Sequence, residues 1–297
     1  MCAPRHRTTV DLGLAIVTQR DRGRIRPDNR PDNRPDRRRG EPVRNVYVIG
    51  IGAGDPEQLT LQAVRVLADL DVVLVIDKGE AKRELTDLRH ELCATHITKP
   101  YRVLTAADPD RDRTATDQVG YTGAVGDWYD ARAEVIGALL RDEVSAGESV
   151  GILVWGDPAL YDSTLRVLDR VEQRGTVEFG YQVIPGITSL QTLAARHKVT
   201  FTGVGAPVHV TTGRRLAAGM PAELDDVLVM LDGSETFAAL DDPDLDIYWG
   251  AYLGMPGELL VAGNLQERKA EIVALRAQAR ARHGWIMDSY LLRRRRP

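Results

Sequence analysis

Side chains that can transfer protons or hold a charged ligand gather in two stretches of this sequence. The first is Asp77-Lys78-Gly79-Glu80, which follows an apolar run over residues 72–76. The second follows a similar run over residues 150–155 and contains Asp157 and Tyr161. Carboxylates, an amine and a phenol at such places are candidates for acid–base chemistry. A charged stretch of this kind fits a solvated loop equally well, so the surrounding elements have to be considered.

The apolar runs are typical of buried parallel strands, and the clearest of them leads into a glycine-rich turn. Residues 46–49 and Ile51 are β-branched or aromatic, and helical spacing begins near Thr60. Between them lie Gly50, Gly52 and Gly54. This order opens a doubly wound α/β domain, in which ligands bind beyond the carboxyl ends of the strands. The glycines allow a ligand to approach closely, although a turn that only packs the helix on the strand has the same composition.

This turn does not match the dinucleotide-binding fingerprint. The pattern G-x-G-x-x-G requires glycine three residues after Gly52, where the chain has Asp55. Pro56 then removes a backbone N–H from a place where a phosphate would need one. Pyrophosphate binding, and with it a dinucleotide-dependent oxidoreductase, is disfavoured.

Two more predicted strands end in turns of glycine and proline. One strand leads into Gly156-Asp157-Pro158, and the other, residues 181–184, leads into Pro185-Gly186. Thr188 or Ser189 can cap the helix that follows the second of these turns. Capping alone is a sufficient structural reason for either hydroxyl.

The character of the chain changes twice along its length. Residues 1–44 form an Arg/Pro/Asp-rich extension with tandem repeats, expected to be disordered, with an RNA or membrane tether as the less favoured alternative. Residues 45–200 predict an N-terminal α/β domain with a parallel sheet, in which the polar residues 101–126 indicate a lid or loop. Residues 201–297 predict a C-terminal α/β domain with a mixed sheet, since several strand spacings suit antiparallel neighbours.

Composition and charge disfavour several classes of protein. The chain is 43% hydrophobic and 28% charged, as in ordinary globular proteins. Residues 1–44 hold 12 Arg against 6 Asp and Glu, so with an overall charge of −4 the rest carries −10, which disfavours a nucleic-acid enzyme. The apolar runs are too short to cross a bilayer, and the six histidines lack metal-ligand spacing. Cys2 and Cys93 are the only cysteines, which fits a reducing cytoplasm.

Three glycine–proline turns in this order resemble the tetrapyrrole methylase family, and the resemblance covers essentially all of residues 45–297. It implies two α/β domains that bind S-adenosylmethionine in a cleft between them, and homodimers are usual in the family. Five further stretches narrow the resemblance to members that methylate C1 of precorrin-5 and release its acetyl group as acetate: Asp77-Lys78-Gly79-Glu80, residues 154–164, Met230-Leu231-Asp232-Gly233, residues 248–254 and residues 282–288. Methylation of another ring carbon without loss of acetate is the main alternative.

The resemblance implies cofactor contacts by motif position. Ala53 in the first turn stands where relatives often have proline, and it keeps the turn small. The carboxylate of Asp157 in the middle turn suits the ammonium group of the cofactor, although it equally suits a helix cap. The other implied contacts are Gly156, Leu160, Thr188, Ser189, Asp232 and Gly254. Of these, Asp232 replaces a residue that is often apolar in relatives.

The implied reaction mainly requires in-line positioning of a carbon nucleophile and a methyl group. Removal of the acetyl group also requires a general base for water and a donor for the oxyanion. The candidates for these tasks are Asp77, Lys78, Glu80 and Tyr161. For the substrate carboxylates the nearest cations are Arg214-Arg215 and Lys82-Arg83, for which solvated surface charge is an equal alternative.

Overall fold

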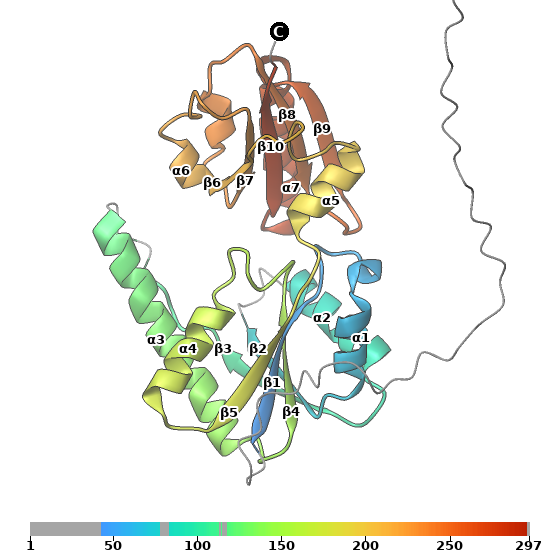
Figure 1. Cartoon of the computed structure of the whole chain (residues 1–297), viewed down its shortest axis with the longest axis vertical. Coiled ribbons are helices and arrows are strands. Elements are labelled where there is room, and N and C mark those ends of the chain that lie inside the picture. Colours follow the sequence, from blue (N-terminus) through green and yellow to red (C-terminus); the bar gives the residue numbers. More distant parts are fainter. Residues whose placement is uncertain (1–42, 78–82, 113, 115–117, 296–297) are drawn as a thin grey trace, which may run out of the picture. The chain divides into compact units, whose positions relative to one another are not determined.

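Two five-stranded sheets form the framework of the protein (Figure 1). The structure, a computed structural model, describes residues 43–77, 83–112, 114 and 118–295. The extension predicted over residues 1–44 lies outside the described residues except for its last two. Of these, Arg44 is the first residue of strand β1.

All strands of the first sheet are parallel, in the order β3-β2-β4-β1-β5. The inner strands are rich in valine, isoleucine and leucine because helices cover both faces of the sheet. The strands are β1 (Arg44–Gly50), β2 (Val72–Asp77), β3 (Arg102–Ala107), β4 (Ser149–Val154) and β5 (Phe179–Ile184).

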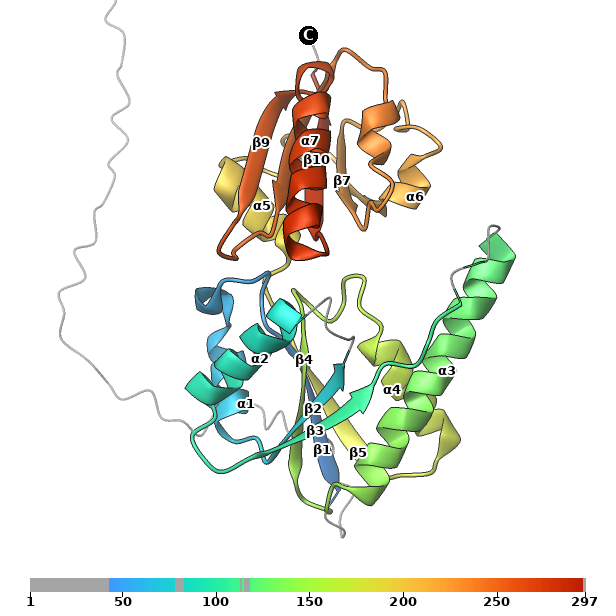
Figure 2. The same cartoon turned by 180° about the vertical axis from the view of Figure 1, so that it is seen from behind.

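Helices α1 (Leu61–Ala68) and α2 (Arg83–His96) cover one face of the first sheet, and α3 (Gln118–Asp142) and α4 (Thr164–Arg174) cover the other (Figures 1 and 2). A short 3-10 helix (Pro56–Gln58) precedes α1. The predicted N-terminal α/β fold with a parallel sheet is therefore confirmed.

The lid or loop predicted over residues 101–126 is wrong in part. Strand β3 occupies Arg102–Ala107, and α3 begins at Gln118. β3 is an edge strand whose side chains are mostly exposed, so its sequence lacks the apolar run of an inner strand. Residues 118–126 of α3 contain three glycines and several polar residues, which hide the helical period.

The second sheet is mixed, as predicted, with the order β6-β7-β10-β8-β9. Only the β6–β7 pair is parallel, and the other three pairs are antiparallel. The strands are β6 (His209–Thr212), β7 (Asp226–Met230), β8 (Leu245–Ala251), β9 (Leu259–Asn264) and β10 (Asp288–Arg294).

Helix α7 (Leu265–His283) packs on one face of the second sheet, and α5 (Ser189–His197) packs on the other through Leu190 and Leu193 (Figures 1 and 2). Two short helices, α6 (Gly213–Leu216) and a 3-10 helix (Thr236–Ala239), complete it. The division between residues 200 and 201 stays a prediction. Among the described helices, none has the length and apolar character that crossing a bilayer requires.

Candidate functional site

Three glycine-containing turns lie side by side at the carboxyl edge of the first sheet. They follow β1, β4 and β5, which are neighbours in the sheet and aligned in register. Because parallel strands end at the same edge, the turns at residues 50–56, 156–163 and 185–188 meet there. We call these three segments the turn cluster.

Glycine is required in the turn cluster because backbones pack directly on one another. A Cβ at Gly186 would overlap the carbonyl oxygen of Gly156, and a Cβ at Gly50 would lie 2.6 Å from the amide nitrogen of Gly186. Gly156 has a φ of +63° and donates its N–H to the carbonyl of Gly52 over 2.7 Å. Contact between the turns therefore explains Gly50 and Gly186 without a ligand.

Asp157 joins two turns of the cluster. Its Oδ1 accepts a hydrogen bond from the amide of Ala159 at 2.8 Å, and its Oδ2 accepts one from the amide of Gly186 at 2.9 Å. It does not cap α4, because the amide of Thr164 donates to Asp162 instead. The direction of the Asp157 carboxylate is fixed, and each oxygen can still accept a second hydrogen bond.

The first turn also touches the segment that follows β8. Gly254 has a φ of +77°, and a Cβ on it would lie 2.7 Å from the amide nitrogen of Asp55. Its own N–H donates to Glu258 over 2.7 Å. Arg196 pairs with both Glu258 (2.9 Å) and Asp55 (3.7 Å). The structure thus brings Gly254 to the turn cluster.

Ala53 and Leu160 belong to one apolar cluster. Ala53 is buried together with Leu190, Leu193 and Leu253, and Leu160 packs against them. These residues come from two turns of the cluster, from α5 and from the segment after β8. They form a buried apolar cluster that joins two turns of the turn cluster to α5.

Thr188 and Ser189 stand at the start of α5. Thr188 is the N-cap residue of α5 and forms a capping box with Gln191. The helix-capping role predicted for it is therefore observed. The hydroxyl of Ser189 lies 2.9 Å from that of Ser289 on β10. Both hydroxyls have partners within the protein, and their predicted contacts with a cofactor stay predictions.

Asp232 is buried just after the end of β7, next to Tyr290 of β10. Its Oδ2 accepts hydrogen bonds from the hydroxyl of Tyr290 and the amide of Thr236, each at 2.7 Å. Its Oδ1 accepts from the hydroxyl of Thr236 at 2.9 Å. The side chain is directed into the fold and is 3% exposed. The cofactor contact predicted at Asp232 stays a prediction.

The carboxylate of Asp232 is part of a larger polar group that we call the Arg276 network: Asp232, Glu235, Arg276, Asp288 and Tyr290. Arg276, 2% exposed, donates to the side chains of Glu235 and Asp288 and to the carbonyl of Asp232. Burial and the neighbouring charge of Asp232 raise the pKa of Tyr290 far above its usual value.

Two of the four predicted catalytic residues are described, and both lie at strand ends of the first sheet. Asp77 is the last residue of β2 and its side chain is exposed. Tyr161 is 43% exposed, has a φ of +52°, and its hydroxyl lies 3.5 Å from the carbonyl of Val210 on β6. Burial raises the pKa of the Tyr161 phenol. Lys78 and Glu80 lie outside the described residues.

A buried ion pair at the same edge was not predicted from the sequence. Arg132 of α3 binds both carboxylate oxygens of Asp108 at 2.7 Å and donates to the hydroxyl of Ser163 at 3.0 Å. Its guanidinium also stacks on the Trp128 ring at 4.0 Å. Asp108 follows the missed strand β3, so the sequence offered no sign of this contact.

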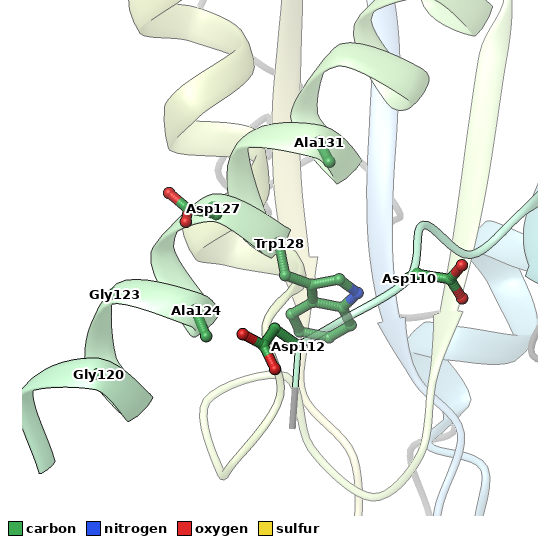
Figure 3. Close-up of a pocket in the computed structure, with 8 residues that line it drawn as sticks. All are labelled: Asp110, Asp112, Gly120, Gly123, Ala124, Asp127, Trp128 and Ala131. Atoms are coloured by element: carbon green, nitrogen blue, oxygen red, sulfur yellow. The ribbon is translucent and has the colours of Figure 1, made fainter. Parts of the chain in front are cut away.

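A separate groove of about 580 Å³ lies between α3 and the segment before it (Figure 3). Its polar side chains include Asp110, Asp112 and Asp127, and none of the predicted site residues lines it. Its carboxylates would repel an anionic ligand. In the described part of the chain, His, Cys, Asp and Glu side chains form no group of three that could hold a metal ion.

Comparisons with known proteins match the chain over most of its length. Residues 45–268 match the family of tetrapyrrole (corrin/porphyrin) methylases. The chain is 46% identical to precorrin-6A synthase (deacetylating) of Sinorhizobium sp, over 85% of this chain and 96% of that one. It is 30% identical to the S-adenosyl-L-methionine-dependent uroporphyrinogen III methyltransferase, chloroplastic, of Arabidopsis thaliana, over 68% and 50%. The crystal structure of the cobalamin synthesis related protein CobF from Corynebacterium diphtheriae superimposes with a TM-score of 0.72 at 35% identity, over 85% and 99%.

Proposed function

Because this chain belongs to the tetrapyrrole (corrin/porphyrin) methylases, we propose that it is a precorrin-6A synthase (deacetylating), an S-adenosylmethionine-dependent C-methyltransferase of cobalamin biosynthesis. The proposed reaction methylates C1 of precorrin-5, with loss of the acetyl group as acetate, to give precorrin-6A. The observation that carries the proposal is the 46% identity to the Sinorhizobium precorrin-6A synthase over 96% of that protein.

The residues at the turn cluster fit S-adenosylmethionine. The Asp157 carboxylate, which can accept further hydrogen bonds, suits the ammonium group, and the apolar cluster that contains Ala53 and Leu160 suits its apolar parts. When bound, this cofactor supplies an activated methyl group on a sulfonium. The residues proposed to hold it are Ala53, Gly156, Asp157, Leu160, Thr188, Ser189, Asp232 and Gly254.

Removal of the acetyl group is assigned to the strand ends of the same edge. The raised pKa of Tyr161 keeps its phenol protonated at neutral pH, so it can donate a hydrogen bond to the acetyl oxygen. Water adds to the acetyl carbonyl carbon, and Asp77 accepts its proton, with Lys78 and Glu80 as the other candidates. The bond from C1 to the acetyl carbon breaks and acetate leaves; the electron pair left on C1 would form the bond to a methyl group whose bond to the sulfonium sulfur breaks.

The proposed substrate carries several carboxylates, which cations near the turn cluster would bind. Arg214 of α6 is one candidate, and its guanidinium lies 3.8 Å from the centroid of the Tyr121 ring on α3. Arg215 is exposed beside it, Lys82 lies outside the described residues, and Arg83 begins α2. A homodimer and a cytoplasmic location remain parts of the proposal.

The test is incubation with precorrin-5 and S-adenosylmethionine labelled in its methyl group. We expect one acetate released for each methyl group transferred. Methylation with the acetyl group retained would instead indicate another tetrapyrrole methyltransferase. Calorimetry with S-adenosylhomocysteine and NAD(H) side by side is the control for cofactor class, and binding of NAD(H) alone would refute the methyltransferase.

A further inference from the structure

One arginine near the turn cluster differs from the others in how few partners its guanidinium has among the described residues. Arg89 lies on α2 and is partly buried, with Cζ 5.6 Å from the centroid of the Trp155 ring. The charge of Asp162 acts on it, while the nearby thiol of Cys93 is neutral because burial raises its pKa to about 11. Among the residues that the structure describes, none forms a hydrogen bond or a close ion pair with the guanidinium.

Other buried arginines of this protein have carboxylate partners. Arg132 binds both oxygens of Asp108, and Arg276 binds Asp288 and Glu235. For Arg89, desolvation lowers the pKa to about 10. A cation withdrawn from water without a close partner is costly to a fold, and such groups occur most often at functional sites.

The position of Arg89 connects it with the proposed site. Trp155 directly precedes Gly156 of the turn cluster, and it packs against the apolar clusters of both sheets. Leu85, one helical turn before Arg89 on α2, is buried among residues of the second sheet. The guanidinium therefore lies against Trp155, which leads into the turn cluster, and within reach of the charge of Asp162 in that cluster.

We propose that Arg89 binds a carboxylate of the tetrapyrrole substrate, an inference that rests on the proposed function. A guanidinium binds a carboxylate through two parallel N–H···O bonds, which partial burial strengthens. The Trp155 ring restricts the guanidinium by cation–π contact. The indole Nε1 of Trp155 is buried and has no acceptor among the described residues, so it offers the same ligand another donor.

The test compares Arg89→Gln with Arg170→Gln in the full-length protein. Arg170 is the matched control because it also stacks on an aromatic ring, that of Tyr129 at 5.1 Å, yet pairs with Asp130 on α3. For Arg89→Gln we expect the KM for precorrin-5 to rise about tenfold to a hundredfold, with a smaller change in kcat. The Kd for S-adenosylhomocysteine should stay within about twofold, and the melting temperature should not fall, because the substitution removes a partly buried charge that has no hydrogen-bond partner among the described residues. Arg170→Gln should leave the KM and both other values unchanged.

An unchanged KM in a folded Arg89→Gln variant would overturn the proposal. An equal loss of affinity for S-adenosylhomocysteine would also overturn it, by assigning the carboxylate to the cofactor. If Arg89→Gln does not fold, Arg89→Lys keeps the charge without the two-pronged donor, and a smaller rise in KM is expected.

Binding of uroporphyrin III, a stable polycarboxylate tetrapyrrole, separates this proposal from the proposed function. It is measured on enzyme saturated with S-adenosylhomocysteine and requires no turnover. Should the wild-type protein make no precorrin-6A, weaker binding of this probe by Arg89→Gln still supports the role of Arg89. Equal binding by the variant and the wild type, or no binding by the wild type, refutes it.

Discussion

Asp157 and Asp232 are the two acidic residues predicted to contact the cofactor, and their surroundings differ. Asp157 lies in the turn cluster, partly exposed, and its carboxylate accepts two backbone hydrogen bonds. Asp232 is buried just after β7, where Tyr290 and Thr236 donate hydrogen bonds to both oxygens of its carboxylate. The first carboxylate fixes loops and keeps acceptor capacity, whereas the second stabilises a core.

The comparison shows that position at a strand end does not determine what a carboxylate does. Both residues follow the carboxyl end of a strand, β4 and β7. The two carboxylates differ in how many hydrogen-bond donors surround them and in how deeply those donors are buried. A carboxylate enclosed by hydroxyl and amide donors has few lone pairs left to accept a hydrogen bond from a ligand. We therefore expect changes at Asp157 to affect ligand binding and changes in the Arg276 network to affect stability.

The largest expected effect is in the Arg276 network. Arg276→Ala leaves the buried Asp288 carboxylate with Trp249 Nε1–H as a donor but without its paired cation, and it removes a donor from the Asp232 carbonyl, so we expect a loss of about 3–5 kcal/mol in unfolding free energy. Chemical denaturation measures it. The control is Arg268→Ala on the same helix, which removes only an exposed pair with Glu271 and should cost less than about 1 kcal/mol. Similar losses in the two variants would show that the network does not stabilise the second sheet.

A smaller effect is expected from crowding the turn cluster. The added methyl group of Gly186→Ala would overlap the carbonyl of Gly156, and such overpacking typically costs about 1–3 kcal/mol. The turns should separate, and the affinity for S-adenosylhomocysteine should fall. Gly126→Ala on α3, where a Cβ meets no neighbour, should leave both quantities unharmed. Wild-type affinity in Gly186→Ala would mean that close packing of the turns is not required for binding.

Substitution of the two acids tests whether Asp157 serves ligand binding and Asp232 serves stability. Asp157→Asn removes one charge-assisted acceptor, so the affinity for S-adenosylhomocysteine should fall about tenfold to a hundredfold, or roughly 1.5–3 kcal/mol. Asp232→Asn should lower the melting temperature and weaken the affinity of the folded protein less than Asp157→Asn does, because its carboxylate oxygens are already occupied by Tyr290 and Thr236. Isothermal titration of both variants decides. Unchanged affinity in folded Asp157→Asn would remove this residue from the proposed contacts.

The smallest effect is expected from the extension. Deleting residues 1–42, ahead of β1, should leave the affinity for S-adenosylhomocysteine and the melting temperature essentially unchanged. The reason is its repetitive Arg/Pro/Asp composition and the absence of apolar periodicity. A drop of several degrees in calorimetry, on the order of 1 kcal/mol, would show that it packs on the rest of the protein.

The sequence predicted the parts of the fold that burial dictates. Strands β1 and β4 are covered on both faces, so their residues form apolar runs that end at recognisable turns. The mixed second sheet followed from short spacings between strands. The edge strand β3 was missed because most of its side chains are exposed and none is buried, so its sequence has no apolar run. The start of α3 was missed as well.

Contacts between distant residues could not be predicted. Asp157 and Gly186 are 29 positions apart, and their hydrogen bond exists only because β4 and β5 both flank β1. The burial of Asp232 depends on Tyr290, which reaches it from β10. Nothing in the sequence singled out Arg89. Its contact with the Trp155 ring is seen only once the fold places α2 beside the end of β4.

Hydrogen exchange with and without saturating S-adenosylhomocysteine shows whether the turn cluster binds the cofactor. We expect slower amide exchange in peptides that cover residues 50–56, 156–163 and 185–188. Peptides from the acidic groove, residues 120–131, should exchange at the same rate in both states. Protection confined to the groove, with the turn cluster exchanging at its ligand-free rate, would show that the cofactor does not bind at the turn cluster.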